Sequence, residues 1–355
     1  VYTITSTDSN DDKIILDIGS SNFTYSSVSV GTASKVGNTV ECIGFTTNNP
    51  AVTIQFTAEA TYSVTAKSTN IAGTYGDSSL SSADSITIAN FSATGGTIST
   101  YSGYKVHTFT SSGTITFNTA GSVDVLVVAG GGGATTASDC CTGGGGAGAG
   151  GLIATSGANV TAQSYSIVVG AGGSTGNGGS NSTALGNTAV GGGRGASYSG
   201  NAATSGGSGG GSCFSVFTPG SGTAGQGNSG GVGTGASGFY TGGGGGGAGA
   251  AGGNSSTTTN VPGVGGIGIQ NAYKTGANIY YAGGGGGASR GTTYSPANDG
   301  AQGGSGGGGK GAGNAIVATA GSINTGGGSG GSADKATGQA GLAGGSGIVV
   351  IRYAV

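Results

Sequence analysis

Glycine fills the second part of this chain in runs long enough to take the place of an ordinary core. Of the 355 residues 89 are glycine, and most of these follow residue 129. The main runs, interrupted mostly by Ala and Ser, are 130–133, 143–151, 191–195, 206–211, 242–253, 283–287, 303–313 and 326–331. Because glycine has no side chain to bury, such runs either stay flexible or pack backbone against backbone.

The sequence around the runs favours ordered packing. The glycine region starts after VDVLVV (123–128) and ends at GIVVIRY (347–353), and it holds aromatic residues, which flexible linkers lack. A polyproline II helix has three residues per turn and no internal hydrogen bonds, and only glycine lets such helices approach closely. We therefore expect a bundle of polyglycine II helices with loop inserts across residues 130–346. Buried positions in it should be Gly, and outward positions Ala, Ser, Thr or Asn.

Strand-like segments at the margins of the glycine region predict a β-platform. These segments are 104–129, 165–170 and 347–353. VDVLVV is apolar on both faces except at Asp124, as expected of a central strand that is buried on both sides. We expect the three apolar strands to pair in one sheet. No helical periodicity is present, so the predicted fold class is all-β with essentially no α-helix.

Residues 1–92 predict a separate all-β domain that precedes the glycine-rich domain of residues 93–355. Seven short runs rich in Val, Ile, Thr and Tyr are separated by polar clusters. They are residues 1–7, 13–18, 25–30, 39–45, 52–58, 61–68 and 85–91. This strand count is typical of an immunoglobulin-like sandwich. Residues 61–79 resemble one hairpin of fibronectin type III modules, with Tyr62 as the corner tyrosine.

Charge and composition argue against several classes of function. Only 6% of the residues are charged and the net charge is −2, so nucleic acid is not an expected partner. No segment approaches the roughly 20 apolar residues of a membrane span. One histidine, His107, and two glutamates leave few acid–base groups, and no nucleophile–His arrangement is visible. We therefore expect no enzymatic activity and no cofactor, with His107 as a structural residue.

The cysteines and one acidic turn leave alternatives open. The four cysteines lack CxxC spacing, so a zinc site is not expected. Cys140 or Cys141 could form a disulfide with Cys213, and small buried thiols are the alternative. Residues 8–12 carry oxygen ligands that suit calcium, but a solvated turn is the favoured interpretation because the calcium-loop pattern is missing. The chain begins at Val1 and has no methionine, from which we expect a processed or partial product.

Four segments together resemble a known family. They are GYKVHTFT (103–110), VDVLVVAGGGG (123–133), YSIVVGAGG (165–173) and GGSGIVVIRY (344–353). This frame resembles the glycine-rich domain of phage virion proteins, which occurs at the ends of tail fibres and adhesins. The resemblance implies a virion or otherwise extracellular protein that attaches to a host-surface glycan or protein. It also implies contacts with other virion subunits and a homo-oligomer, either a trimer or a polymer.

Aromatic residues in the inserts are the candidate contacts with a receptor, because aromatic faces stack on sugar rings and fill interface pockets. The candidates are Tyr198, Phe239, Tyr240, Tyr273, Tyr280, Tyr281, Arg290 and Tyr294. Alternatively, these residues cap the glycine bundle as its only bulky core, a role that we favour for Phe214 and Phe217. The competing function is a structural subunit of an extracellular filament or capsid decoration whose main activity is self-assembly. Ice binding is disfavoured because the inserts are irregular.

Overall fold

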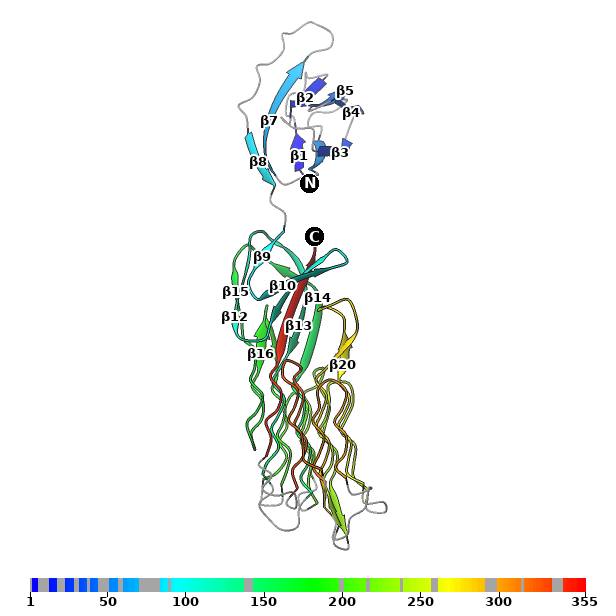
Figure 1. The fold of residues 1–355 in the computed structure, drawn as a ribbon. Helices are drawn as coiled ribbons and strands as arrows, with labels where there is room; N and C mark the ends of the chain where they lie inside the picture. Colours follow the sequence, from blue (N-terminus) through cyan, green and yellow to red (C-terminus); the bar gives the residue numbers. More distant parts are fainter. Residues whose placement is uncertain are drawn as a thin grey trace. The chain divides into compact units, whose positions relative to one another are not determined.

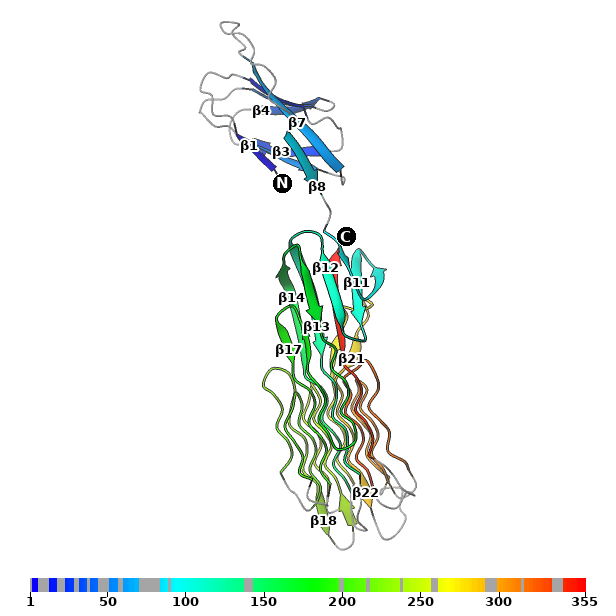
Figure 2. The same ribbon diagram turned by 90° about the vertical axis from the view of Figure 1, so that its left-hand side faces the viewer.

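The computed structural model divides the chain into two compact units, Val1–Phe91 and Ser92–Val355. In residues 1–90 it describes the backbone of eight strands. In the remainder it describes all residues except 137–142, 198–200, 215–217, 237–238, 257–260, 291–298, 314–315 and 334–340. Every regular element in these described parts is a β-strand, which confirms the predicted all-β class (Figures 1 and 2).

The first unit contains two antiparallel sheets. Its strands are β1 (Tyr2–Thr5), β2 (Lys13–Asp17), β3 (Phe23–Val28), β4 (Thr32–Val36), β5 (Thr39–Ile43), β6 (Ala51–Phe56), β7 (Ala60–Thr69) and β8 (Asp84–Ile88). The sheet orders are β1-β6-β3 and β4-β5-β2-β7-β8. Strand β4 is additional to the seven predicted strands. The Tyr62 side chain and residues 8–12 lie outside the described parts, so the immunoglobulin or fibronectin assignment and the calcium alternative stay predictions.

A five-stranded antiparallel sheet forms the platform of the second unit. Its strands are β10 (Thr97–Tyr101), β11 (Tyr104–Phe109), β23 (Ile348–Ala354), β13 (Gly121–Val128) and β14 (Leu152–Val160), in that order across the sheet. Strand β23 lies between β11 and β13, where Ile351 is opposite both His107 and Val125. The apolar segments at the two margins of the glycine region therefore pair directly, as the sequence predicts.

The third apolar segment joins a different sheet. Strand β15 (Ser164–Ile167) pairs with β12 (Gly113–Phe117), which also pairs with β9 (Ala93–Thr94). The prediction that all three apolar strands share one sheet was therefore wrong. Ser164 and Ser166 are exposed whereas Ile167 is buried, so β15 has one polar face. A strand of this kind suits an outer sheet better than a position buried on both faces.

The second unit also contains short antiparallel strands at three places. Strands β16 (Ser182–Ala184) and β17 (Asn187–Ala189) form one of them, and β20 (Ile269–Asn271) and β21 (Ile279–Tyr281) form another. Strand β19 (Phe239–Thr241) pairs with both β18 (Thr234–Ala236) and β22 (Ser289–Arg290). Figures 1 and 2 show β18 and β22 at the end of the glycine runs that is opposite the platform. We call this the far end, and the other the platform end.

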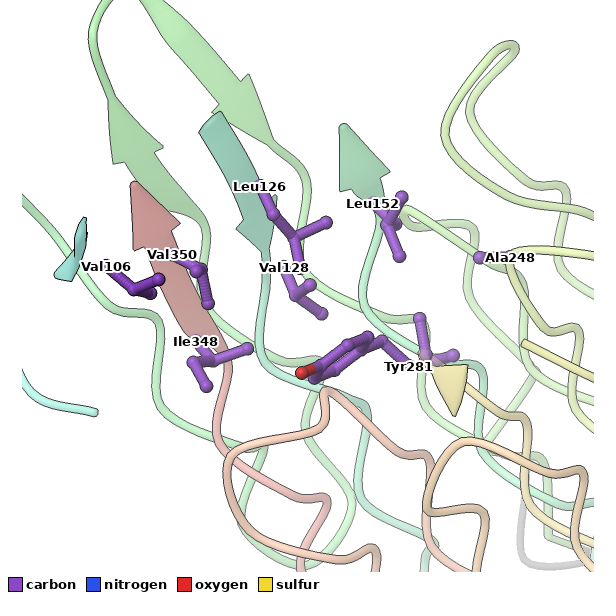
Figure 3. Packing of buried hydrophobic residues seen from close by; sticks show 10 residues of the cluster. Val106, Leu126, Val128, Leu152, Ala248, Tyr281, Ile348 and Val350 are labelled. Atoms are coloured by element: carbon purple, nitrogen blue, oxygen red, sulfur yellow. The ribbon is translucent and has the colours of Figure 1, made fainter. Parts of the chain in front are cut away.

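A hydrophobic cluster joins the platform sheet to the start of the glycine runs. It includes Leu126 and Val128 of β13 and Ile348 and Val350 of β23. Figure 3 shows the ring of Tyr281 next to Val128 and Ile348, and its residue is only 2% exposed. The platform therefore holds the runs through ordinary apolar packing at one end.

Between the two ends the runs lie side by side (Figures 1 and 2) and bond to one another through their backbones. In the central run, the N–H groups of three successive residues donate to three different runs: Gly144 to Ser332, Gly145 to Ala196 and Gly146 to Gly243. The next three residues repeat the order, with Ala147 donating to Ser329, Gly148 to Gly193 and Ala149 to Gly246. The donor pattern thus repeats every three residues, the repeat of a polyproline II helix.

The same central run also accepts hydrogen bonds from three further runs. Its carbonyl groups receive N–H groups from Ala129 and Gly132, from Ser208 and Gly211, and from Gly285 and Ala288. Residues 143–151 are therefore surrounded by backbone partners on all sides, donating to three neighbouring runs and accepting from three others. This arrangement satisfies buried backbone groups that a single extended run would leave unpaired.

Close approach between runs explains why most of these positions are glycine. A Cβ atom added at Gly145 would lie closer than 3.0 Å to the carbonyl oxygen of Gly211, and one at Gly146 would meet that of Gly285 in the same way. Real Cβ atoms essentially never approach other atoms so closely. Glycine is therefore required at these positions by the neighbouring backbone rather than by positive φ angles.

The expectation that buried run positions are all glycine was wrong. Ala147 and Ala149 are fully buried within the central run, and Ser212 and Ser332 are buried at the far end. These serine hydroxyls replace backbone partners: Ser212 Oγ accepts the N–H of Gly233 at 2.9 Å, and Ser332 Oγ donates to the carbonyl of Thr135. Small side chains thus have room at particular buried positions of the runs.

Candidate functional site

The structure separates the predicted receptor-binding residues into two groups. Phe239, Tyr240 and Arg290 lie on β19 and β22 at the far end. Tyr273, Tyr280 and Tyr281 lie in or beside the β20–β21 hairpin near the platform (Figure 1). Tyr198 and Tyr294 lie outside the described residues. The two described groups are thus at opposite ends of the runs and cannot form one contact surface.

The three residues of the platform-end group differ in exposure. Tyr281 is buried in the cluster of Figure 3, where burial raises the pKa of its hydroxyl. A side chain that is 2% exposed cannot contact a receptor in this conformation, so we remove Tyr281 from the candidates. Tyr273 is half-buried against Arg352, whereas Tyr280 is 40% exposed.

The far end brings an aromatic pair and an arginine together. Tyr240 is directly opposite Arg290 in the β19–β22 pairing. The Phe214 ring packs against the Tyr240 ring with a centroid distance of 4.4 Å and a tilt of 40°. Phe239 and Tyr240 are both half-buried, so part of each ring faces solvent. Phe217, which we favour as core together with Phe214, lies outside the described residues.

Hydroxyl groups of Thr234, Thr241 and Ser255 form a hydrogen-bond network at this hairpin. Thr241 Oγ1 donates to the carbonyl of Thr234 at 3.1 Å, and the hydroxyls of Thr234 and Ser255 are 2.8 Å apart. Thr241 and Ser255 are buried, which fixes the β18–β19 hairpin to the adjacent run. The far end therefore carries the half-buried Phe239 and Tyr240 on a hairpin that is held by buried hydrogen bonds, with the half-buried Arg290 on the adjacent strand β22.

The only described cysteine near this region is Cys213, which precedes Phe214 and is fully buried. Cys140 and Cys141 lie outside the described residues. The proposed disulfide with Cys213 therefore stays a prediction.

A second polar constellation, at the platform end, centres on an ion pair that the sequence analysis did not identify. Arg352 Nε donates to Asp124 Oδ2 at 2.9 Å, and its Nη1 donates to the Tyr101 hydroxyl at 2.6 Å. Its guanidinium lies 4.3 Å from the ring centroids of both Tyr104 and Tyr273. Such contacts combine charge with favourable cation–π geometry.

Hydrogen bonds complete the ion pair and connect it to the β20–β21 hairpin. Asp124 Oδ1 accepts from Ser156 Oγ at 2.6 Å and from the Gly157 N–H at 3.1 Å. The Tyr101 hydroxyl lies 3.1 Å from the carbonyl oxygens of both Ala272 and Tyr273. We call Asp124, Arg352 and Tyr101 the clamp, because together they hold the loop that connects β20 and β21 against the platform.

The clamp shifts the pKa values of both charged groups toward the ionised state. Burial alone would raise the pKa of Asp124, but hydrogen bonds from Ser156, Arg352 and Gly157 and the guanidinium charge together lower it. Burial would likewise lower the pKa of Arg352, but Tyr101 and Asp124 outweigh it and raise this pKa. A hollow of about 310 Å³ beside the clamp is lined by Tyr104, Asp124, Ser156 and Arg352, among others.

The sequence contained one signal for the clamp. The apolar strands β13 and β23 each carry a single charged residue, and these charges are opposite in sign. In the β13–β23 pairing, Asp124 lies directly opposite Arg352. Finding this from sequence would have required the register of the two strands, which local patterns do not provide.

His107 forms a buried structural network in agreement with its expected role. Its Nδ1 lies 2.7 Å from the Gly95 carbonyl oxygen, and its Nε2 lies 3.3 Å from the Tyr353 hydroxyl. Because a carbonyl can only accept, Nδ1 carries the proton and Nε2 accepts from Tyr353. The Tyr353 oxygen in turn accepts the Ala93 N–H at 2.9 Å. Burial is the main cause that lowers the pKa of His107.

A metal site and a membrane-spanning helix are both absent from the described residues. These residues contain no group of three or more His, Cys, Asp and Glu side chains that could hold a metal ion. They also contain no helix with the length and apolar character needed to cross a lipid bilayer.

Residues 107–354 match the family model described as a glycine-rich domain. The chain belongs to this family. The matched part of this glycine-rich domain begins at His107 in β11 and extends into the end of β23, so it includes Asp124 and Arg352 of the clamp and the far end, whereas Tyr101 precedes it. No curated protein matches the chain.

Proposed function

We propose that this protein is a non-enzymatic virion structural protein, of the tail-fibre or adhesin type, that binds a receptor on the host surface. In this proposal the glycine runs are polyglycine II helices that form a rigid scaffold. The platform holds one end of the scaffold, and the far end carries the residues that touch the receptor.

The observation that carries the proposal is the six-neighbour backbone bonding of residues 143–151. Buried runs with this bonding resist bending because several hydrogen bonds must break together. A rigid support reduces the conformational entropy that a binding surface loses when it engages its partner. The three-residue repeat of the donors supports the polyglycine II assignment.

The chemistry at the two ends favours binding at the far end. Near the platform, Asp124 and Arg352 already satisfy one another and hold the hairpin, and His107 is buried. At the far end, Tyr240 and Arg290 lie side by side on partly exposed strands. Aromatic faces and guanidinium groups suit sugar rings and anionic groups of surface glycans, and they are also common in protein interfaces.

Cell adsorption with end-specific variants tests this proposal. Fluorescently labelled full-length chain is incubated with a panel of bacterial strains and with immobilised bacterial surface glycans. We expect Tyr240→Ala and Arg290→Ala each to reduce binding at least tenfold, the loss typical of a hot-spot residue. Tyr280→Ala is the matched control, because it removes a tyrosine that is 40% exposed at the opposite end.

Circular dichroism of each variant establishes that the fold is retained, and Tyr240→Phe keeps the packing on Phe214 while removing the hydroxyl. Equal binding by wild type, Tyr240→Ala and Arg290→Ala would show that the far end is not the contact surface. Loss of binding in Tyr280→Ala alone would place the contact at the platform end instead.

A further inference from the structure

One outer run of the bundle has a regular face that the proposed receptor binding does not use. In residues 261–268, exposure repeats every three residues: Val261, Val264 and Ile267 are exposed, and the residues between them are buried. The three side chains are 42%, 56% and 49% exposed. The buried residues of this run are Gly or Pro, so every bulky side chain of the run except that of Pro262 points outward.

The inner side of this run is fully engaged in the bundle. Gly263 and Gly266 donate to the carbonyls of Gly242 and Gly245 at 2.9 Å, and Gly265 donates to Gln302 at 2.9 Å. Among the described residues, by contrast, no backbone acceptor receives the N–H of Val264 or Ile267. The outward side of the run is therefore an edge with unused backbone donors, comparable to the edge strand of a β-sheet.

The unused N–H groups of this edge can donate to the carbonyl groups of a further glycine run, which would then add to the bundle. The chain offers many such runs, and any second copy of it presents the same ones. Charge repulsion gives little protection against this addition, because no charged residue occurs between 255 and 273 and the net charge of the chain is −2. Exposed edges in other β proteins are commonly protected by charged side chains, which this edge does not have.

Branched side chains at the exposed positions block that addition sterically. At most glycine positions inside the bundle even one Cβ atom is too large: at Gly245 it would lie closer than 3.0 Å to the carbonyl oxygen of Ala147. Val and Ile carry two heavy substituents on Cβ, next to the backbone, and so prevent an approach at this distance.

We propose that the row Val261/Val264/Ile267 terminates the backbone lattice at this edge and prevents a second copy of this chain from adding its glycine runs there. The row closes this edge of the bundle by shape rather than by charge. This role does not depend on the receptor-binding proposal, and it permits oligomers that form through other surfaces.

Mass measurements on matched variants test the lattice-terminating role. The triple variant V261G/V264G/I267G opens the edge, and V261T/V264T/I267T keeps β-branched bulk but removes apolar character. Light scattering after size exclusion is measured on the full chain at several concentrations. We expect the Gly variant to have at least twice the mass of wild type at high concentration, and the Thr variant to match wild type.

Two outcomes would overturn the proposal. One is a Gly variant whose mass equals that of wild type over the whole concentration range while its thermal transition is retained. The other is a wild type that is heavier than the Thr variant, which would make the row an apolar docking surface. If the triple Gly variant does not fold, Val264→Gly alone opens the centre of the row and must show a smaller, concentration-dependent rise in mass.

Discussion

Replacing Gly145 by alanine tests whether backbone-to-backbone packing holds this protein together. Gly145 lies in the central run, where its N–H donates to the carbonyl of Ala196 at 2.9 Å. An added Cβ would overlap the carbonyl group of Gly211, whose own N–H bonds to Gly146 at 2.8 Å. Relief of this overlap requires two hydrogen-bonded runs to move apart, because the overlapping atoms belong to the backbone and not to a flexible side chain.

The expected loss follows from two contributions. Overpacking a well-packed interior costs about 1–3 kcal/mol. Separating the runs leaves at least one buried backbone donor without an acceptor, at about 1–3 kcal/mol. Alanine also lowers the conformational entropy of the unfolded chain, which offsets the loss of stability by up to about 1 kcal/mol. We therefore expect Gly145→Ala to lower the free energy of unfolding by about 3 kcal/mol, or Tm by about 6 °C for a unit of this size.

Differential scanning calorimetry of the full chain measures this shift, with Gly113→Ala as the control. Gly113 lies on β12, and a Cβ there would meet the Phe109 ring at 3.6 Å, an ordinary contact. The control should keep or slightly raise Tm through its effect on the unfolded state. Equal transition temperatures for Gly145→Ala, Gly113→Ala and wild type would refute backbone packing as the source of stability.

Four further substitutions test other parts of the structure. Ser208 Oγ is buried and has no hydrogen-bond partner, so Ser208→Ala should leave the free energy of unfolding, measured by urea titration, unchanged or raise it. Ser182 Oγ instead accepts the Gly170 N–H at 2.8 Å, so in the same titration Ser182→Ala should lower the free energy of unfolding by about 1–3 kcal/mol. Leu185 has φ 49° in the β16–β17 turn, where Asn tolerates positive φ better, so Leu185→Asn should raise Tm and a lower Tm would contradict this account. The pKa of His107 is lowered below 6.5 in the folded state, so the unfolded chain binds the proton more readily. The stability from His107 should therefore be complete above pH 6.5 and fall as the pH drops below this value. His107→Gln should flatten that part of the pH profile of Tm, and an unchanged slope would exclude the histidine as its source.

Local patterns were sufficient to predict many of the strands and their type. VDVLVV and GIVVIRY predict buried strands because both faces are apolar, and they pair as β13 and β23. Strand β14 was missed because its sequence, LIATSGANV, mixes small, polar and apolar residues without a regular alternation. Its place at the edge of the sheet follows from pairing with β13 rather than from its own pattern. The clamp was missed for the same reason, because it also depends on strand pairing: the register places Asp124 opposite Arg352.

The candidate receptor-contact residues were likewise predictable only in part. The sequence could select the aromatic residues of the inserts, but not the end of the bundle at which each insert lies. The backbone pairing places Tyr240 and Arg290 together at the far end and buries Tyr281 beside the platform. Neighbouring inserts in the sequence can therefore serve opposite ends of the bundle, because each run crosses its length.

The sequence by itself determined that the core of this protein is made of backbone. Glycine in these runs leaves no side chains to bury, and the apolar strands at both margins require an ordered structure between them. Only the tertiary structure decided which run lies next to which, and where Ala147 or Ser212 fits inside. The physical reason is that every glycine run presents the same N–H and C=O groups, so partner choice depends on the platform register and on the connections between runs.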